Sequence, residues 1–423
     1  IYNPNGVSLS DAVMRVNMGE GGGFGTGEFV SPDGLILTNH HVAFDALVSA
    51  STKENDYATN GYKADTRANE LPAKGYNLLL TQRVEDVTAK VLNAVNGLTG
   101  EAREQAVRKN IEELQKAEQA KAPKGATVRI QAVSSGFFYY LYQTMSVRDV
   151  RVVYAPPKSI GFFGGDPDNF EWPRHTGDFT FLRAYVAPDG SSAEYSPNNV
   201  PFKPKKFLTI SLNGVRDGEF VFVLGYPGGT TRYRESQSIA YAQNVNLPFI
   251  VDYLKAQVAA YTTIGEENEE KRIKLQSEIF SLNNVIKAYE GGVQAMRRAD
   301  LVSQRRSEEE KFAAWVNANP ERKAKYGDLL ARFDTLYKNN FATAARDRVL
   351  RTLPNPSLTP VFRQILDAAQ ASAQGKTLTA EKRADITKYY ENRDPLLERE
   401  MLRFYLRSIA DLPADQKFAP VEN

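Results

Sequence analysis

Cysteine is absent from this chain of 423 residues, and histidine is almost absent. Without cysteine there is no disulfide framework, no thiolate metal site and no thiol nucleophile. Only His40, His41 and His175 can supply imidazole chemistry. Any site that needs a histidine base must therefore be built around one of these three residues.

Two further shortages exclude whole classes of protein. No apolar run approaches the ~20 residues that cross a bilayer, so no membrane span is predicted. The 53 Lys and Arg nearly cancel the 51 Asp and Glu, which leaves a net charge of +2. Nucleic-acid-binding domains normally carry a strong basic excess, so no nucleic-acid partner is expected. Because the chain begins at Ile1 and not at Met, we expect a processed or trimmed product.

The pattern along the chain changes from strands to helices. Strand-like runs rich in aromatic and β-branched residues dominate residues 1–232, and charged helical periodicity dominates residues 233–423. The sequence therefore predicts a β-rich domain over 1–232 followed by an all-helical domain over 233–423. Within them we expect a hairpin turn at 31–34, a helix over 101–121, strands that include 220–224, and a helix start at Ser307, three residues before Glu310.

The two adjacent histidines follow an apolar strand. Residues 25–42 (GTGEFVSPDGLILTNHHV) combine a glycine-rich strand, a tight turn, a second strand and a polar tip with His40 and His41. An isolated pair of histidines is more often a pair of surface residues. Here the strand that ends in Thr-x-x-His, before a small apolar residue, resembles the presentation of the base in two-barrel serine proteases of the trypsin type. This alignment makes His41 the general base.

A histidine base needs a carboxylate to orient it. Asp166 and Asp168 fit the bland interpretation of turn formers, whose side chains bond to the backbone. Asp178 differs because it precedes the apolar run 179–182 and is expected to be buried. A buried carboxylate costs several kcal/mol unless it is paired, and an imidazole would supply the partner.

Residues 25–42, 150–179 (VRVVYAPPKSIGFFGGDPDNFEWPRHTGDF) and 221–233 (VFVLGYPGGTTRY) closely resemble the dipeptidyl peptidase 7 and 11 family of bacterial serine exopeptidases. The resemblance runs along essentially the whole chain. It implies a trypsin-like double β-barrel with a large inserted helical domain that roofs the active site. It also implies release of dipeptides from peptides with a free N-terminus, no metal or other cofactor, a homodimer, and a location in the periplasm or at the outer surface of a Gram-negative bacterium.

The resemblance also assigns roles to single residues. It makes His41 the base and Asp178 the acid, and it gives Asn169 and Asn284 contacts with the substrate's free amino group. Phe170 stands where better-known members have Trp, so an aromatic wall remains but the indole donor is lost. For Asn284, in the turn-like motif Asn-x-x-Lys, the alternative is an ordinary asparagine on a helix surface.

Two departures from the family pattern concern the surroundings of the site. Members often carry a cysteine after the paired histidines and another in the upstream glycine-rich strand, whereas Val42 and residues 21–25 have none. The resemblance implies that these two cysteines form a disulfide in such members, so here packing alone must hold the site. Glu171 replaces a residue that is usually apolar. It either adds a negative charge beside the amine site or faces solvent, and we favour solvent.

The largest departure is the missing nucleophile. No Gly-x-Ser-Gly motif occurs in the chain. The resemblance implies the order His, Asp, helical domain and then Ser in a second barrel, which also holds the oxyanion hole. We therefore expect a chain from which that barrel is largely missing and which is inactive alone. The alternative is a non-catalytic peptide-binding or scaffold protein of the same fold. An endopeptidase of the high-temperature-requirement type shares TN-x-H-V but does not explain residues 164–178 or the helical domain.

Overall fold

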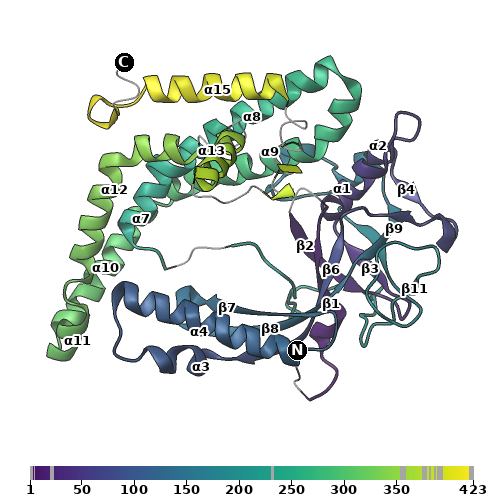
Figure 1. Ribbon diagram of the computed structural model, residues 1–423, viewed down its shortest axis with the longest axis horizontal. Helices are drawn as coiled ribbons and strands as arrows, with labels where there is room; N and C mark the ends of the chain where they lie inside the picture. The colour runs from purple at the N-terminus through teal and green to yellow at the C-terminus, as the bar shows by residue number, and fades with distance from the viewer. Residues whose placement is uncertain are drawn as a thin grey trace. The chain divides into compact units, whose positions relative to one another are not determined.

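The computed structural model describes residues 3, 5–19, 23–229, 233–352, 359–373, 379–380, 383–384, 387 and 394–418. The chain forms two compact units. The first contains Ile1–Gly165 and Pro173–Gly229, and the second contains Asp166–Trp172 and Thr230–Asn423 (Figure 1). The short segment Asp166–Trp172 thus belongs to the helical unit, although both of its flanks belong to the first unit.

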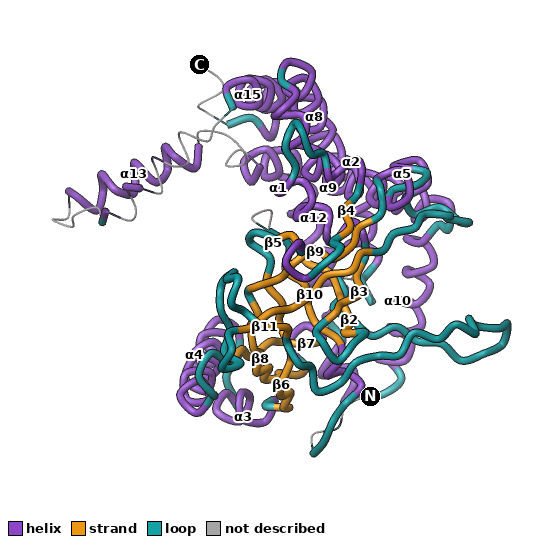
Figure 2. Tube along the Cα trace, turned by 90° about the vertical axis from the view of Figure 1, so that its right-hand side faces the viewer, coloured by secondary structure: helices purple, strands orange, loops and turns teal. Residues whose placement is uncertain are grey.

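The first unit is built on one antiparallel sheet (Figure 2). Among the described residues the sheet has 11 strands in the order β4-β9-β10-β3-β2-β1-β6-β8-β7, with β11 paired to β10 and β5 paired to β9. The strands are β1 Val13–Asn17, β2 Phe24–Phe29, β3 Leu35–Thr38, β4 Tyr62–Lys63, β5 Leu71–Pro72, β6 Asn77–Asp86, β7 Ala126–Val133, β8 Phe138–Val147, β9 Asp149–Ala155, β10 Thr180–Val186 and β11 Val200–Pro201.

Alternation of buried and half-buried residues explains why these segments are strands. In β3, Ile36 and Thr38 are buried, whereas the residues between and before them are half-buried, so one face of the strand points into the core. The predicted hairpin turn between β2 and β3 is confirmed. The Val30 amide donates to the Leu35 carbonyl over 2.8 Å, and Gly34 adopts a φ of 68°, which a side chain would disfavour.

Several short helices and one long helix lie between β3 and β10 along the chain. They are α1 His40–Ala50, α2 Tyr57–Asn60, α3 Thr88–Leu92, α4 Gly100–Lys121, α5 Lys158–Gly161 and α6 Gly165–Asp168, which begins at the last residue before the helical segment. The helix predicted over 101–121 is confirmed as α4. It lies beside β7 in both views, where Val107 packs with Val128, Ile130 and Leu141 (Figures 1 and 2).

The described part of the second unit contains helices and no strand. These are α7 Ser236–Tyr241, a π-helical turn Ala242–Asn246, α8 Leu247–Glu267, α9 Glu269–Arg298, α10 Leu301–Asn317, α11 Pro320–Tyr326, α12 Leu329–Thr352, α13 Thr359–Ala373 and α15 Pro395–Ala410. Tyr253 of α8 packs against Met401 and Tyr405 of α15, both of which are fully buried. Among the described residues no helix is long and apolar enough to cross a membrane.

Two local predictions were wrong. Residues 220–224 form no strand, and the whole of 202–229 is drawn as loop in Figure 2. Phe220 and Val223 are 88% and 96% exposed, because no described strand offers them a hydrogen-bonding edge. Ser307 does not begin a helix but lies inside α10, which starts at Leu301 after the left-handed residue Asp300 (φ 45°).

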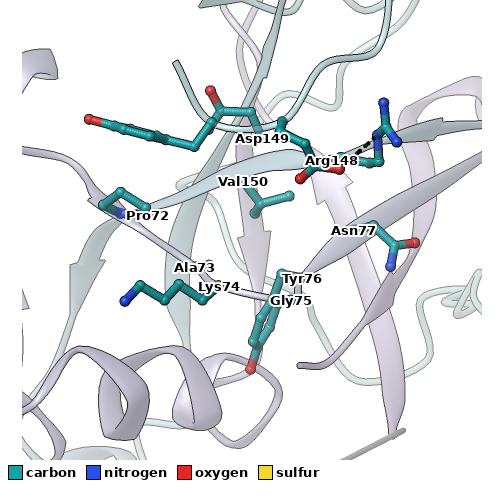
Figure 3. A pocket seen from close by; sticks show the side chains of 11 residues that line it. Pro72, Ala73, Lys74, Gly75, Tyr76, Asn77, Arg148, Asp149 and Val150 are labelled. Carbon is teal, nitrogen blue, oxygen red and sulfur yellow. Dashed lines mark ion pairs between the residues drawn. The ribbon is translucent and has the colours of Figure 1, made fainter. Parts of the chain in front are cut away.

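A pocket of about 410 Å³ opens on the first unit, away from every residue to which the sequence assigns a role (Figure 3). Its wall includes an ion pair between Arg148 and Glu194 at 3.3 Å. Asp149 also lines the pocket, and its buried carboxylate is bound by Arg151 and Asn199. The full lining is Pro72, Ala73, Lys74, Gly75, Tyr76, Asn77, Arg148, Asp149, Val150, Glu194 and Tyr195.

Candidate active site

Strand pairing brings His41 and Asp178 together across 137 positions of sequence. In the antiparallel pair of β3 and β10, Thr38 lies opposite Thr180. When this register is extended by two residues, Asp178 faces the first residue of α1, directly before His41. The contact therefore follows from the register of β3 and β10, and not from the conformation of the segments that carry His41 and Asp178.

The Asp178 carboxylate binds both the side chain and the backbone of His41. Its Oδ2 lies 2.8 Å from Nδ1 of the imidazole, and its Oδ1 accepts the backbone N–H of His41 over 3.0 Å. Asn39 adds an amide N–H to Oδ2 at 3.2 Å. Because His41 lies in the first turn of α1, the carboxylate also sits at the positive end of that helix. The expected contact is present, while the catalytic role of either residue remains a prediction.

The electrostatics of this pair suit a general base. Burial opposes ionisation of Asp178, but the hydrogen bonds and the charge of His41 outweigh it, so the pKa of Asp178 lies below its usual value. The ionised carboxylate accepts the proton on Nδ1 of His41, which leaves Nε2 unprotonated in the neutral ring. The His41 side chain is 44% exposed and that of Asp178 is 19% exposed. The free nitrogen is therefore accessible while the carboxylate is sheltered.

The neighbouring His40 has the opposite environment. Its side chain is fully buried, its Nε2 lies 3.2 Å from the Pro156 carbonyl, and the ring of Phe162 packs edge-on at 4.9 Å. Burial lowers the pKa of His40 to about 4, so the ring is neutral near pH 7. A side chain at Gly161 would place its first carbon 2.4 Å from the His40 ring. His40 is thus a packing residue, and it cannot meet a substrate.

The loop that carries Asp178 is tied to α5. The Thr176 hydroxyl donates to the Gly161 carbonyl over 2.9 Å, and the Gly177 amide donates to the Ile160 carbonyl over 2.9 Å. These bonds fix the backbone immediately before Asp178. His175, the third histidine, is exposed on the same loop.

Close packing stands where the family pattern has a cysteine. Val42 of α1 is buried against Gly25 of β2, and a Cβ atom at Gly25 would lie 2.4 Å from the Val42 Cγ2 atom. Gly21 and Gly22 lie outside the described residues. The helix that carries His41 is therefore seated directly on the β2 backbone, and this contact needs a glycine at position 25.

The residues predicted to bind the amino group meet in the second unit. The Asn169 side-chain amide donates to the Asn284 side-chain carbonyl over 2.8 Å, and Asn169 is buried. Phe170 follows as an exposed residue (62%), with a φ of 62°, in the left-handed region. Asn284 thus contacts Asn169 and is not a lone surface residue. Glu171, expected to face solvent, is exposed, but it also forms an ion pair with Lys287 at 3.3 Å.

Three contacts of these sites were not predicted. Asn39 bonds to Asp178, and Asn283 and Lys287 of α9 bond to the segment that carries Asn169. A signal was available for the last two, because residues four apart share one face of a helix. Among the described residues, no group of His, Asp or Glu is arranged to hold a metal ion.

The profile of the family described as Peptidase S46 matches residues 1–423. The chain belongs to the peptidase S46 family. Dipeptidyl-peptidase 7 of Capnocytophaga gingivalis is 36% identical to this S46 chain over 351 residues, covering 83% of it and 48% of the relative. The Asp/Glu-specific dipeptidyl-peptidase of the same organism is 37% identical over 341 residues, covering 80% and 46%.

A solved structure shows the same architecture. Porphyromonas endodontalis DPP11, in a complex with the dipeptide Arg-Asp, matches 100% of this S46 chain and 61% of its own, with a TM-score of 0.79 and 26% identity. The chain spans about half the length of the curated relatives it matches.

Proposed function

We propose that this S46 protein is a serine-type dipeptidyl peptidase that releases dipeptides from peptides with a free N-terminus. The observation that carries the proposal is the contact of His41 with Asp178, which leaves Nε2 of an exposed imidazole ready to accept a proton. The names of the relatives, dipeptidyl-peptidase 7 and Asp/Glu-specific dipeptidyl-peptidase, support the reaction class.

In the proposed mechanism, Nε2 of His41 takes the proton of a serine hydroxyl as its oxygen attacks the carbonyl of the second peptide bond. The imidazolium then gives that proton to the leaving amine, and a water molecule hydrolyses the dipeptidyl ester with His41 again as the base. Asp178 holds the tautomer and stabilises the transient cation. We place the serine outside residues 1–423, because the chain has no Gly-x-Ser-Gly motif.

The second cluster would define the exopeptidase. Asn169 and Asn284 present side-chain carbonyl oxygens that can accept N–H bonds from an ammonium group. The exposed ring of Phe170 offers the ammonium an aromatic face. A buried asparagine, Asn169, next to an exposed aromatic residue, Phe170, is a suitable site for the ammonium group at the N-terminus of a peptide.

The wider assignments belong to the same proposal. We infer a trypsin-like fold whose second barrel uses 202–229 together with strands from outside residues 1–423. The exposure of Leu212, Phe220 and Val223 supports this, since apolar strand-like runs normally find a partner. A homodimer, a periplasmic or outer-surface location, and the absence of a cofactor complete the proposal.

The test uses the full-length protein and free-amine dipeptidyl coumarylamides with Asp or Leu at the second position, each compared with its N-acetylated form. The parent should cut at least one free-amine substrate and neither acetylated one. Asn169→Ala should raise KM for the free amine about 5- to 100-fold, the equivalent of about 1–3 kcal/mol for an unpaired ammonium.

Asn110→Ala is the matched control, because Asn110 belongs to the first unit, where its side chain bonds to the Val91 carbonyl. This variant should behave as the parent does. A parent that binds peptides without cutting them would instead identify a non-catalytic binding protein. An unchanged KM in Asn169→Ala would reduce Asn169 to a turn residue.

A further inference from the structure

One lysine on α9 makes all of its polar contacts with the segment that holds Asn169. Lys287 Nζ donates to the Asp166 carbonyl over 3.1 Å and to the Pro167 carbonyl, and it pairs with the Glu171 carboxylate at 3.3 Å. A lysine ammonium has three N–H donors, and here three acceptors come from six consecutive residues. All of these contacts lie within the second unit.

The two carbonyl contacts account for the position of the lysine. α6 ends at Asp168 after a single turn. The Asp166 carbonyl accepts the Asn169 amide over 3.2 Å, but a carbonyl oxygen has two lone pairs, and no following helical turn supplies a second donor to Asp166 or Pro167. A cation at the C-terminal end of a helical turn binds such carbonyls favourably. The Glu171 pair adds little, because its carboxylate side chain is 63% exposed and exposed ion pairs are weak. The stabilising contacts of Lys287 are therefore those to the backbone.

The segment needs external support because of Phe170. A φ of 62° is rare for a bulky residue, and it persists only where the surroundings hold it. The segment before Phe170 is held by α9: Asn169 by Asn284, and the Asp166 and Pro167 carbonyls by Lys287. Asn283 holds the beginning of the segment through the Asp166 carboxylate at 2.8 Å. One helix face thus fixes the turn at three points.

We propose that Lys287 is a positioning residue for substrate recognition, which holds the 166–171 turn so that Asn169 and Phe170 can meet the N-terminal ammonium of the peptide. This inference rests on the proposed function and adds a residue to it. Lys287 does not touch the substrate. It acts through the backbone of the turn.

The test compares Lys287→Met with Lys274→Met in the full-length protein, with the free-amine coumarylamides as substrates. Lys274 pairs with Glu270 on the same helix and does not contact the turn, so it is the matched control. Lys287→Met should raise KM about 10-fold with kcat nearly unchanged, and Lys274→Met should leave both as in the parent. Glu171→Gln should also leave KM within about 2-fold of the parent, as an exposed pair implies.

Two further readouts distinguish positioning from general damage to the fold. In the Asn169→Ala background, Lys287→Met should raise KM by less than 2-fold, because both substitutions act on one contact. Hydrogen exchange at the amides of Asn169 and Glu171, which bond to the Asp166 and Asp168 carbonyls, should be faster in Lys287→Met than in the parent.

The outcomes separate the two proposals. A parent that cuts neither substrate overturns the proposed function, and the role of Lys287 falls with it. A parent that cuts, combined with an unchanged KM in Lys287→Met, overturns the role of Lys287 alone. A full additive loss in the Asn169→Ala background also overturns it, because Lys287 would then act elsewhere.

Discussion

At the scale of single residues, the two adjacent histidines show how position decides chemistry. His41 has Nδ1 on a carboxylate and a side chain that is 44% exposed, whereas His40 is enclosed by Phe44, Phe162 and the backbone of Gly161. Both histidines lie in the first turn of α1, which begins two residues after the last residue of β3. Successive residues of a helix point about 100° apart, so neighbours cannot share one environment.

The first prediction concerns the orienting carboxylate. In the full-length protein, Asp178→Asn should lower kcat by about 10⁴-fold with little change in KM, because an amide favours the wrong tautomer of His41. Asp189→Asn is the control, since Asp189 bonds only within its own exposed turn. Steady-state kinetics on a free-amine substrate measure the effect. A loss below 10-fold would remove Asp178 from the catalytic machinery.

The second prediction concerns pH. The pKa of His40 falls from 6.5 to about 4 on folding, through burial above all, with Asp178 opposing the shift and His41 and Lys158 adding to it. The unfolded chain therefore takes up a proton near pH 6.5 that the folded chain refuses. The stability due to the neutral ring is complete above pH 6.5 and is lost as the pH falls towards 4. Between pH 7.5 and 5 the loss should be about 2 kcal/mol.

Denaturant unfolding of the parent and of His40→Gln at the two pH values measures this loss. The variant should be less stable at both values but should show a shallower dependence on pH. His175→Gln is the control, because His175 is exposed, and its pH dependence should match that of the parent. Equal slopes in the parent and His40→Gln would show that His40 does not drive the acid sensitivity.

Sequence reasoning could predict the contact of His41 with Asp178 and could select Asn169 and Asn284 as candidates, because motif and family resemblance are local patterns of residue type. It could not find that His40 is buried or that Asn39 bonds to Asp178, since both follow from the way β3 and β10 pair. The spacing of Asn283 and Lys287 places both on one face of a helix, but it does not show what Lys287 binds. Its partners are backbone carbonyls, which carry no residue-type signal.

At the scale of elements, local rules succeeded where a segment has its own partners and failed where it lacks them. The hairpin of β2 and β3 closes on itself, and α4 has an apolar stripe against β7, so both followed from periodicity. Residues 220–224 have an equally strong strand pattern and form no strand. A segment becomes a strand only when a neighbouring strand forms backbone hydrogen bonds with it. The described part of the chain provides no such neighbour for 220–224. The prediction of a helix start at Ser307 was wrong because the helix already begins at Leu301 and continues through Ser307. A single capping pattern does not fix a helix boundary.

The third prediction tests the contact between β2 and α1. Gly25→Ala should destabilise the protein by about 1–3 kcal/mol, because its methyl group would overlap the Val42 side chain. Val42→Ala alone should also cost about 2 kcal/mol, through lost burial. The double variant should lose clearly less than the two losses added together, since each change makes room for the other.

Chemical denaturation of the four proteins measures this coupling. Gly228→Ala is the control, because a Cβ at Gly228 meets nothing within 4 Å. Additive losses in the double variant would show that Gly25 and Val42 are not packed against each other. Such a result would leave the position of α1, the helix that contains His41, without an explanation.

At the scale of the whole molecule, the composition and the switch from strand to helix patterns anticipated a β-rich part and a helical part. They could not anticipate that seven residues from the middle of the β-rich part fold with the helices. The amino-acid sequence of 166–172 does not indicate that this segment folds with the helical unit. Their assignment comes from side chains on α9, more than a hundred positions later.

This interleaving has a consequence for dissection by proteases. The chain passes between the units at three places: after Gly165, after Trp172 and after Gly229. No single cut can therefore yield two complete units. A nick after Gly229 would leave 166–172 covalently attached to one fragment while Asn283, Asn284 and Lys287 of the other still grip it. The two fragments would therefore remain associated as a non-covalent complex. They would separate only after the contacts between 166–172 and α9 are broken.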